Sequence, residues 1–320
     1  MRQLSLTDWK PYGNACVMPP NARPSDWTAL AVLVAIWGSS FALSKVAVAH
    51  LDAAWVSALR LSVAAAALLP YALLTGHSLK STSEQLRKFS WLAFIGHAVP
   101  FFLITWGLHF VSSGVSGLMM GAVPIFLVVM AHFALPDERL TLPKAAGFLL
   151  GFIGVLILIG PQQLLNFKLS GDELVGELAV LAGSLCYAVH AVTAKRLGVD
   201  DPVKQTAAVC LLAAFMAVAF ALLLNPGGVM GKPASAYWAV LGLGLLPTAV
   251  ASVVSYWLMH RVGPSFVSFA NYLVPVFALL LGAAALQEPL NWSILAALAF
   301  ILGGIAISRM QPSSTQRISP

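Results

Sequence analysis

The sequence predicts an all-α integral membrane protein with ten transmembrane helices in two inverted five-helix repeats. Three observations support this prediction: the apolar composition, ten long apolar stretches, and a match between the two halves of the chain. Of the 320 residues, 59% are hydrophobic and 9% are charged, whereas soluble domains average about 45–50% and 25%. So few charges cannot cover a water-soluble surface, and the lipid bilayer is the environment that fits this chain.

Proline, glycine or charged residues bound each apolar stretch, which defines the expected helices to within several residues. The stretches are continuous, unlike the alternating segments of about 10 residues that build a β-barrel. Most connections are short, so no extramembrane domain is expected to hold a soluble active site. The expected helices cover residues 27–48, 53–75, 90–110, 114–134, 143–161, 173–195, 204–224, 236–260, 264–286 and 292–309.

Lysine and arginine are distributed unevenly over the connections, which predicts the orientation because basic residues favour the cytoplasmic side. With the N-terminus in the cytoplasm, 14 of the 18 basic residues fall on the cytoplasmic side, and both termini lie there. This distribution also accounts for the net charge of +6, so no nucleic-acid partner is expected. The four basic residues on the outer side are Lys45, Arg60, Lys168 and Lys232.

The ends of the chain are expected to be cytoplasmic tails. Residues 1–26 are polar, contain prolines and lack the apolar core of a signal peptide, so they are expected to be disordered, and residues 310–320 form the second tail. The cysteines, Cys16, Cys186 and Cys210, have no C-x-x-C spacing, and two fall in apolar stretches. Neither a disulfide framework nor a zinc site is expected, and no cofactor is predicted.

The two halves of the chain match at a nearly constant offset. LHFVSSGVSGLMMGAVPIFLVV (108–129) aligns with MHRVGPSFVSFANYLVPVFALL (259–280) at an offset of 151, and WGSSFALSK (37–45) aligns with YAVHAVTAK (187–195) at an offset of 150. Because each half holds five helices, an odd number, the second half enters the membrane from the opposite side. The repeats are predicted to cover residues 27–161 and 173–309.

Inverted repeats are typical of secondary transporters, in which two bundles rock around a site near the midplane of the membrane. The sequence contains none of the motifs H-E-x-x-H, G-x-S-x-G or G-x-x-x-x-G-K-[ST], so neither an enzyme nor direct use of ATP is expected. Two alternatives stay open. A membrane-embedded enzyme acting on lipid-linked substrates would need polar residues clustered at one membrane face, and a channel would need charged rings or a filter-like loop.

Several motifs recur in one known family: WGSSF (37–41) in the first helix, Arg60 early in the second, and Glu-x-Leu after the fourth and ninth. Together with the ten-helix repeat, they resemble the drug/metabolite transporter superfamily, in particular its EamA-type exporters, over residues 27–309. The resemblance implies a bacterial inner (plasma) membrane protein that exports small metabolites such as amino acids or their analogues. The second half departs from the pattern, since YAVHA (187–191) stands in place of WGSSF and Cys210 stands in place of Arg60.

Ionisable residues inside the bilayer are costly and are candidates for function. Among the acids only Glu177 falls within an expected helix, near its outer end, so no carboxylate is available at mid-depth for a proton and a substrate to share. His97 and His190 lie deeper and could carry protons, with a structural role as the alternative. Arg60 could pair with nearby polar groups or attract an anionic group of a substrate.

Polar and aromatic residues of the first, third, fourth, sixth, eighth and ninth helices are expected to line a central cavity. On the first helix, Trp37, Ser40, Phe41 and Ser44 share one face at the spacing i, i+3, i+4, i+7. Aromatic walls with a few hydrogen-bonding groups suit a neutral or zwitterionic, partly apolar small molecule. The expected substrate contacts are Trp37, Ser40, Phe41, Ser44, His97, Trp106, Met120, Tyr187, His190, Tyr256, Trp257, Asn271 and Tyr272.

Overall fold

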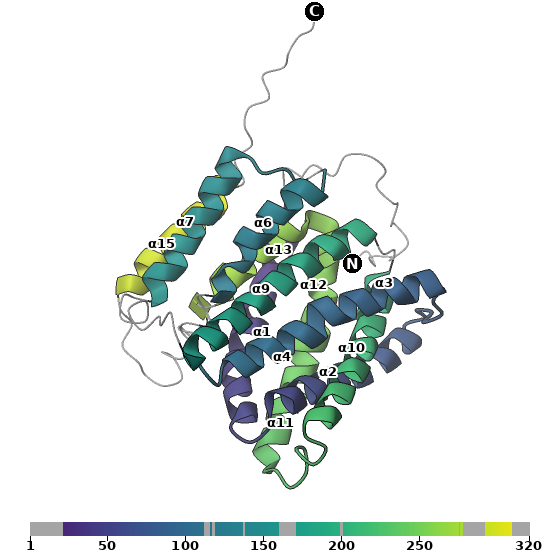
Figure 1. Cartoon of the computed structure of the whole chain (residues 1–320). Coiled ribbons are helices and arrows are strands. Elements are labelled where there is room, and N and C mark those ends of the chain that lie inside the picture. Colours follow the sequence, from purple (N-terminus) through teal and green to yellow (C-terminus); the bar gives the residue numbers. More distant parts are fainter. Residues whose placement is uncertain are drawn as a thin grey trace, which may run out of the picture.

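The computed structural model of the chain is a bundle of helices (Figure 1), and no strand occurs among the residues that it describes. Each of the ten predicted ranges contains helix within the described residues. Five helices in this part of the chain are long and apolar enough to cross a membrane, which confirms the prediction of an all-α membrane protein. The described residues are 22–111, 116, 119–136, 138–159, 171–198, 201–274, 276–277 and 292–308.

The helices of the two halves follow the same order along the chain. The first half contains α1 (Pro24–Val48), α2 (Ala53–Leu74), α3 (Ser83–Ala93), the π-helical turn η1 (Phe94–Ala98), α4 (Val99–Gly107), α6 (Val123–Ala134) and α7 (Leu142–Ile159). The second half contains α9 (Asp172–Leu197), α10 (Pro202–Leu224), α11 (Ala234–Leu243), the π-helical turn η2 (Gly244–Val250), α12 (Ala251–Val262), α13 (Pro264–Ser268) and α15 (Trp292–Ser308).

The third membrane helix of the first half begins seven residues before the predicted start at residue 90. It begins at Ser83, and a capping box defines this start: Thr82 Oγ1 accepts from the Gln85 backbone N–H, and Gln85 Oε1 accepts from the Thr82 N–H. The prediction followed apolar residues only, whereas the first turn of this helix is polar. The polar side chains satisfy the N–H groups that a helix start leaves unpaired.

Helix α1 also begins earlier than predicted, at Pro24 instead of residue 27. Proline suits the first helical position because its missing N–H would be unpaired there. Residues 24–26, which were predicted to belong to the disordered tail, are therefore helical. The rest of that tail (1–21) and the predicted tail at 310–320 lie outside the described residues.

The two π-helical turns occupy equivalent positions in the two halves. η1 begins at Phe94 and η2 at Gly244, a separation of 150 residues, which is the offset of the sequence repeat. In each half the turn interrupts the third membrane helix, α3–η1–α4 in the first and α11–η2–α12 in the second. A π-turn is a rare local geometry, so its recurrence at the repeat offset shows that the halves share local structure.

Helices α2 and α10, which are equivalent under the repeat, pack side by side in opposite directions (Figure 1). Trp55 at the start of α2 donates its indole N–H to the Asn225 carbonyl at the end of α10, at 2.7 Å. At the other end of the pair, His77 Nδ1 lies 2.7 Å from Asp201 Oδ2. Equivalent helices that run antiparallel show that the two repeats are inverted.

Helices α7 and α15 form a second antiparallel pair, visible in Figure 1 as the teal and yellow helices that lie together. Gly147 of α7 faces the Gly304 carbonyl of α15, and Gly154 faces Ile301, whose Cγ1 would lie 2.7 Å from a Cβ added at Gly154. Glycines therefore allow the backbones of this pair to approach closely, as small residues do at helix contacts in membranes.

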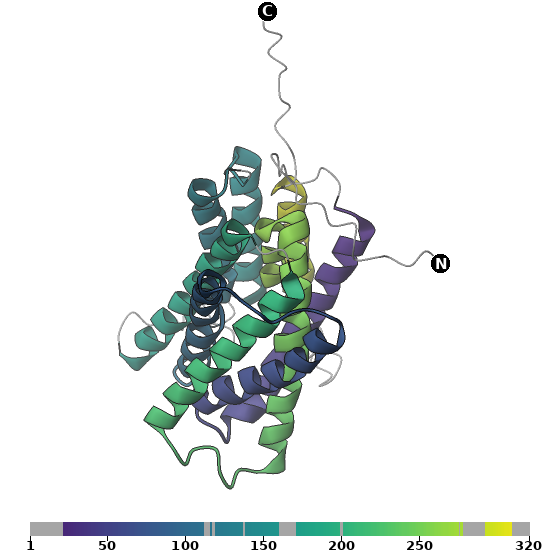
Figure 2. The same cartoon turned by 90° about the vertical axis from the view of Figure 1, so that its right-hand side faces the viewer.

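Two further contacts join helices from opposite halves, and they are equivalent to each other under the repeat. Helix α1 packs along α11 and α12, and α9 packs along α4. In Figure 2 the purple α1 runs beside the light green α11–η2–α12 helix. The cavity described in the next section is lined by residues of α1, α4, α9 and α12.

Candidate functional site

The cavity has a volume of about 220 Å³ and is lined by side chains from both halves of the chain. The first half contributes α1, α2, the η1–α4 segment, and α6 with the residues just before it. The second half contributes α9, the η2–α12 segment and the helix that begins at Pro264. The structure brings nine of the predicted site residues to its walls. They are Trp37, Ser40, Ser44, His97, Met120, Tyr187, His190, Tyr256 and Asn271.

Three predicted residues are not among the cavity-lining residues, and helix geometry explains each case. Trp106, Trp257 and Tyr272 directly follow residues that line the cavity, and successive residues of an α-helix are rotated by about 100°. The prediction placed both members of the pairs Tyr256–Trp257 and Asn271–Tyr272 at the cavity, whereas the structure places only the first of each pair there.

The three residues have other surroundings. Trp106 packs against Phe102 and Phe110, with ring centroids 6.4 and 4.9 Å away. Trp257 is 38% exposed. Tyr272 is buried and donates its hydroxyl to the Phe148 carbonyl of α7 at 2.8 Å. Phe41 belongs to α1, but its side chain lies outside the described part of the structure.

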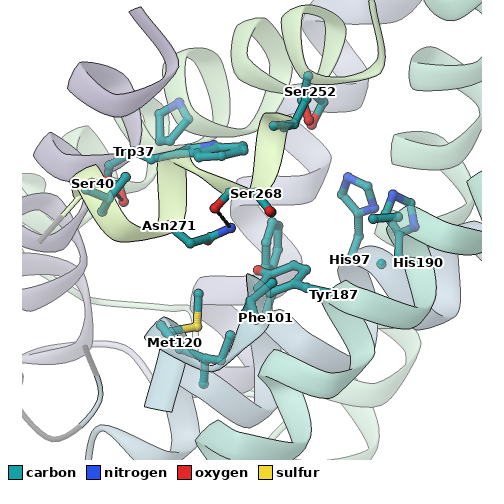
Figure 3. Close-up of a pocket in the computed structure, with 18 of the residues that line it drawn as sticks. Trp37, Ser40, His97, Phe101, Met120, Tyr187, His190, Ser252, Ser268 and Asn271 are labelled. Carbon is teal, nitrogen blue, oxygen red and sulfur yellow. Dashed lines mark hydrogen bonds between the residues drawn. The ribbon is translucent and has the colours of Figure 1, made fainter. Parts of the chain in front are cut away.

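A histidine–tyrosine cluster forms one side of the cavity, and Figure 3 shows its two histidines, His97 and His190, next to each other. Tyr256 Oη and His190 Nε2 are 3.1 Å apart, and the His97 and His190 rings meet edge to face with centroids 5.5 Å apart. Both imidazoles are buried, and the Nδ1 of each has no hydrogen-bond partner among the described residues. Gly96 in η1 makes room for His190, because a Cβ at this position would overlap the imidazole ring.

The opposite side of the cavity carries Trp37, Ser40 and Asn271 (Figure 3). Ser40 donates its hydroxyl to the Trp37 carbonyl at 2.6 Å, and Asn271 Nδ2 donates to the Ser268 carbonyl at 3.3 Å. These polar groups are hydrogen-bonded to their own helices, as Ser and Thr hydroxyls often are within helices. This side therefore presents an indole ring and polar groups without a charge.

Arg60 of α2 also lines the cavity, although it was not among the predicted substrate contacts. Its guanidinium carbon lies 4.0 Å from the centre of the Phe101 ring. Arg60 Nε and Nη2 donate to Thr248 Oγ1 at 3.1 and 3.0 Å, and Thr248 donates to the Leu243 carbonyl at 2.7 Å. The π-turn η2 thus supplies the side chain that holds the arginine.

Phe101 and Thr248, which contact Arg60, are functional candidates that the sequence did not indicate. Phe101 was one apolar residue in an apolar helix, and Thr248 is 188 residues from Arg60. A basic residue in an apolar helix was the available signal, and it pointed to Arg60 without identifying its partners.

Comparison with known proteins identifies the family. The EamA-like transporter family matches the chain twice, over residues 26–160 and again over 174–310. The uncharacterized transporter YoaV of Bacillus subtilis is 28% identical over 84% of this chain and 91% of its own length. The uncharacterized inner membrane transporter YedA of Escherichia coli is 28% identical over 82% of this chain and 83% of its own length.

A solved crystal structure shares the fold, with a TM-score of 0.75 and 22% identity over 90% of this chain and 97% of that chain. Both halves of the sequence match the family, and the apolar helices and inverted repeats agree with it. The chain belongs to the EamA-like transporter family of the drug/metabolite transporter superfamily, and it is a multi-pass inner membrane transporter.

Proposed function

We propose that this protein is a secondary transporter that exports small amphipathic metabolites, such as amino acids or their analogues, by alternating access. The observation that supports this proposal most directly is the cavity between two inverted repeats. Inverted repeats allow two bundles to exchange conformations around one site, so that the site opens to one side of the membrane and then to the other.

The size and chemistry of the cavity support a small, partly apolar substrate. A volume of about 220 Å³ is below the ~300–1,000 Å³ that is typical of sites for drug-sized ligands. The walls combine aromatic rings with hydrogen-bonding groups such as Ser40, Asn271 and the His190–Tyr256 pair. A molecule with an apolar body and a polar head fits such walls, whereas a fully hydrated ion does not.

The test of transport uses purified protein in proteoliposomes loaded with radiolabelled amino acids. Efflux should scale with the amount of protein and should be absent from protein-free liposomes. The absence of protein-dependent flux for every solute in a broad panel of amino acids and analogues would contradict the proposal. A membrane enzyme would instead modify the solute without moving it, and chromatography of the released label separates these outcomes.

We further propose that both termini lie in the cytoplasm, because the distribution of lysine and arginine supports this orientation. Single cysteines at positions 168 and 196, in a background without the three native cysteines, provide the test. Position 168 should react with an impermeant thiol reagent from outside and position 196 only from inside. The reverse pattern would show the opposite orientation.

Protons are a candidate coupling partner because His97 and His190 are the titratable pair at the cavity. Replacing both with glutamine keeps a polar side chain and removes the titration. If a pH gradient drives efflux through these residues, the double variant should lose that drive while retaining downhill flux. Unchanged gradient-driven transport would exclude this route.

A further inference from the structure

We propose that Arg60 binds the carboxylate of the transported molecule, so that the substrates are carboxylates or zwitterions and not amines or amides. This inference rests on the proposed transport function and makes it more specific. It follows from the contacts of Arg60, from the charges around it and from a comparison with the equivalent positions of the other repeat.

The guanidinium of Arg60 faces the cavity with an incomplete set of partners. It carries five N–H donors, and the described residues give it one hydrogen-bonding oxygen, Thr248 Oγ1. That oxygen is neutral, and no ion pair joins Arg60 to a carboxylate in the described part of the chain. A permanent positive charge within a membrane bundle is costly unless an anion neutralises it. A ligand that enters the cavity can supply the missing charge.

The surroundings of Arg60 restrict how an anion can approach. The guanidinium carbon of Arg60 lies 4.0 Å from the centre of the Phe101 ring, and this cation–π contact offsets only part of the cost of the charge. Nε and Nη2 donate to Thr248 Oγ1, which leaves the N–H groups of Nη1 and the second N–H of Nη2 for a ligand. The uncovered N–H groups are then directed as a planar fork, the geometry that a carboxylate matches with two hydrogen bonds.

The second repeat shows that the fold itself does not require this cluster. The positions equivalent to Arg60, Phe101 and Thr248 at the offset of 150 are Cys210, Ala251 and Ala98. The helices and π-turns recur in both halves, but the cation, its aromatic cover and its hydroxyl partner do not. The repeated helices and π-turns therefore form at the equivalent positions without this cluster. Because this cluster has no counterpart under the repeat, the cavity is one-sided: it carries the Arg60 cation in one part of its wall and uncharged groups at Trp37 and Asn271.

The one-sided cavity predicts the orientation of the bound molecule. Its carboxylate lies at Arg60, and its body extends toward the uncharged side that carries Trp37 and Asn271. His97 and His190 line the same cavity and add two polar rings to its wall. An amine of the same shape would place a positive charge next to Arg60 and would be repelled.

The experiment uses the full-length protein in detergent and four probes with the same phenyl group: 3-phenylpropionate, L-phenylalanine, L-phenylalaninamide and phenethylamine. Binding is measured by tryptophan fluorescence and by thermal stabilisation, with sodium chloride as an inorganic anion. The two carboxylates should bind roughly tenfold or more tightly than the amide and the amine. Equal binding of all four probes, no binding of either carboxylate, or equal stabilisation by chloride would overturn the proposal.

Variants of Arg60 test the residue itself. Arg60→Gln should remove the preference for carboxylates, and Arg60→Lys should retain part of it, because lysine keeps the charge without the planar fork. Ser62→Ala is the matched control on the same helix, because Ser62 donates to the Ala58 carbonyl of its own helix and does not line the cavity. If Arg60→Gln does not fold, Arg60→Lys decides the question, and an unchanged preference in that variant would contradict the proposal.

Transport and carboxylate binding can fail separately. Flux in proteoliposomes that does not distinguish carboxylates from amines, or that is unchanged in Arg60→Gln, would overturn the role of Arg60 and leave the transport proposal intact. Binding of 3-phenylpropionate that depends on Arg60, without any flux, would support the anchor and contradict transport.

Discussion

The contact between α1 and α12 and the contact between α9 and α4 are equivalent under the repeat, yet different interactions hold the helices together at each. At the first, Asp26 Oδ1 lies 2.7 Å from Arg261 Nε, and the Asp26 side chain is 1% exposed. The equivalent positions at the second are Gly176 and Phe110. A Cβ added at Gly176 would lie 2.6 Å from Phe110 Cβ, so this contact depends on the absence of a side chain.

The difference extends to the two ends of the bundle. The end that holds Asp26 also holds Glu138, whose carboxylate accepts from Ser265 Oγ at 2.7 Å and from Lys144 Nζ at 3.2 Å. The end that holds Gly176 brings backbones together: a Cβ at Gly107 would lie 2.8 Å from the Gly176 carbonyl. The repeat therefore preserves the placement of helices and leaves the chemistry of each contact free to differ. The α1–α12 contact includes a charged pair, and the α9–α4 contact is a close packing at glycine.

The largest effect is expected from Glu138→Ala at the charged end. The substitution leaves Lys144, which is 12% exposed, without its carboxylate, and removing one partner of a buried pair costs about 3–5 kcal/mol. Guanidinium unfolding in detergent measures this loss of unfolding free energy. Glu84→Ala is the control, because the Glu84–Lys88 pair is solvent-exposed and its removal should change little. Equal effects of the two substitutions would show that burial does not distinguish the pairs.

The next effect is expected from Gly176→Ala at the packed end. Overpacking a close contact costs about 1–3 kcal/mol, whereas Gly303→Ala should be neutral or stabilising, since its nearest neighbour would be 3.7 Å away. A double variant with Phe110→Gly should recover part of the loss, because it removes the Cβ that the new methyl meets. Additive losses in this double-mutant cycle would mean that positions 176 and 110 do not interact energetically in the folded protein.

A smaller effect is expected from Asp26→Asn. The carboxylate is buried, but Arg261 is 32% exposed, so water can solvate the arginine and the expected cost is about 1–2 kcal/mol. The free energy of unfolding should also become less sensitive to added salt than in the wild type. A loss as large as that of Glu138→Ala would show that the pair with the partly exposed Arg261 stabilises the fold as much as the pair with the more buried Lys144.

The smallest effects compare the starts of two equivalent helices. Asp201 Oδ1 accepts from the backbone N–H groups of Val203 and Lys204, both at 3.0 Å. Asp201→Ala should cost about 1 kcal/mol for the lost N-cap, besides the loss of its 2.7 Å contact with His77. Asp52 occupies the same position before α2 without a capping hydrogen bond. Thermal unfolding should therefore show a smaller loss for Asp52→Ala. The reverse order would mean that the Asp52–Asn225 hydrogen bond, at 2.7 Å, outweighs the cap.

The sequence predicted the helices and the repeat because apolar length and a constant offset are properties of the chain itself. It also predicted the cavity face of α1, since Trp37, Ser40 and Ser44 follow helical spacing and all three line the cavity. It could not assign a facing to neighbours such as Tyr256 and Trp257, because either can face inward until the partner helices are placed. The pairing of Arg60 with Thr248 likewise depends on a contact between distant segments.

The paired π-turns carry information about the history of the chain. The hydrogen bond of a π-turn spans one residue more than that of an α-helix, which is the effect of inserting one residue, and it shifts every later residue around the helix axis. Two independent insertions at positions 150 residues apart are a less economical account than one insertion in a five-helix ancestor, followed by duplication and fusion of its gene. In that account the half-length chain already had the turn before the duplication.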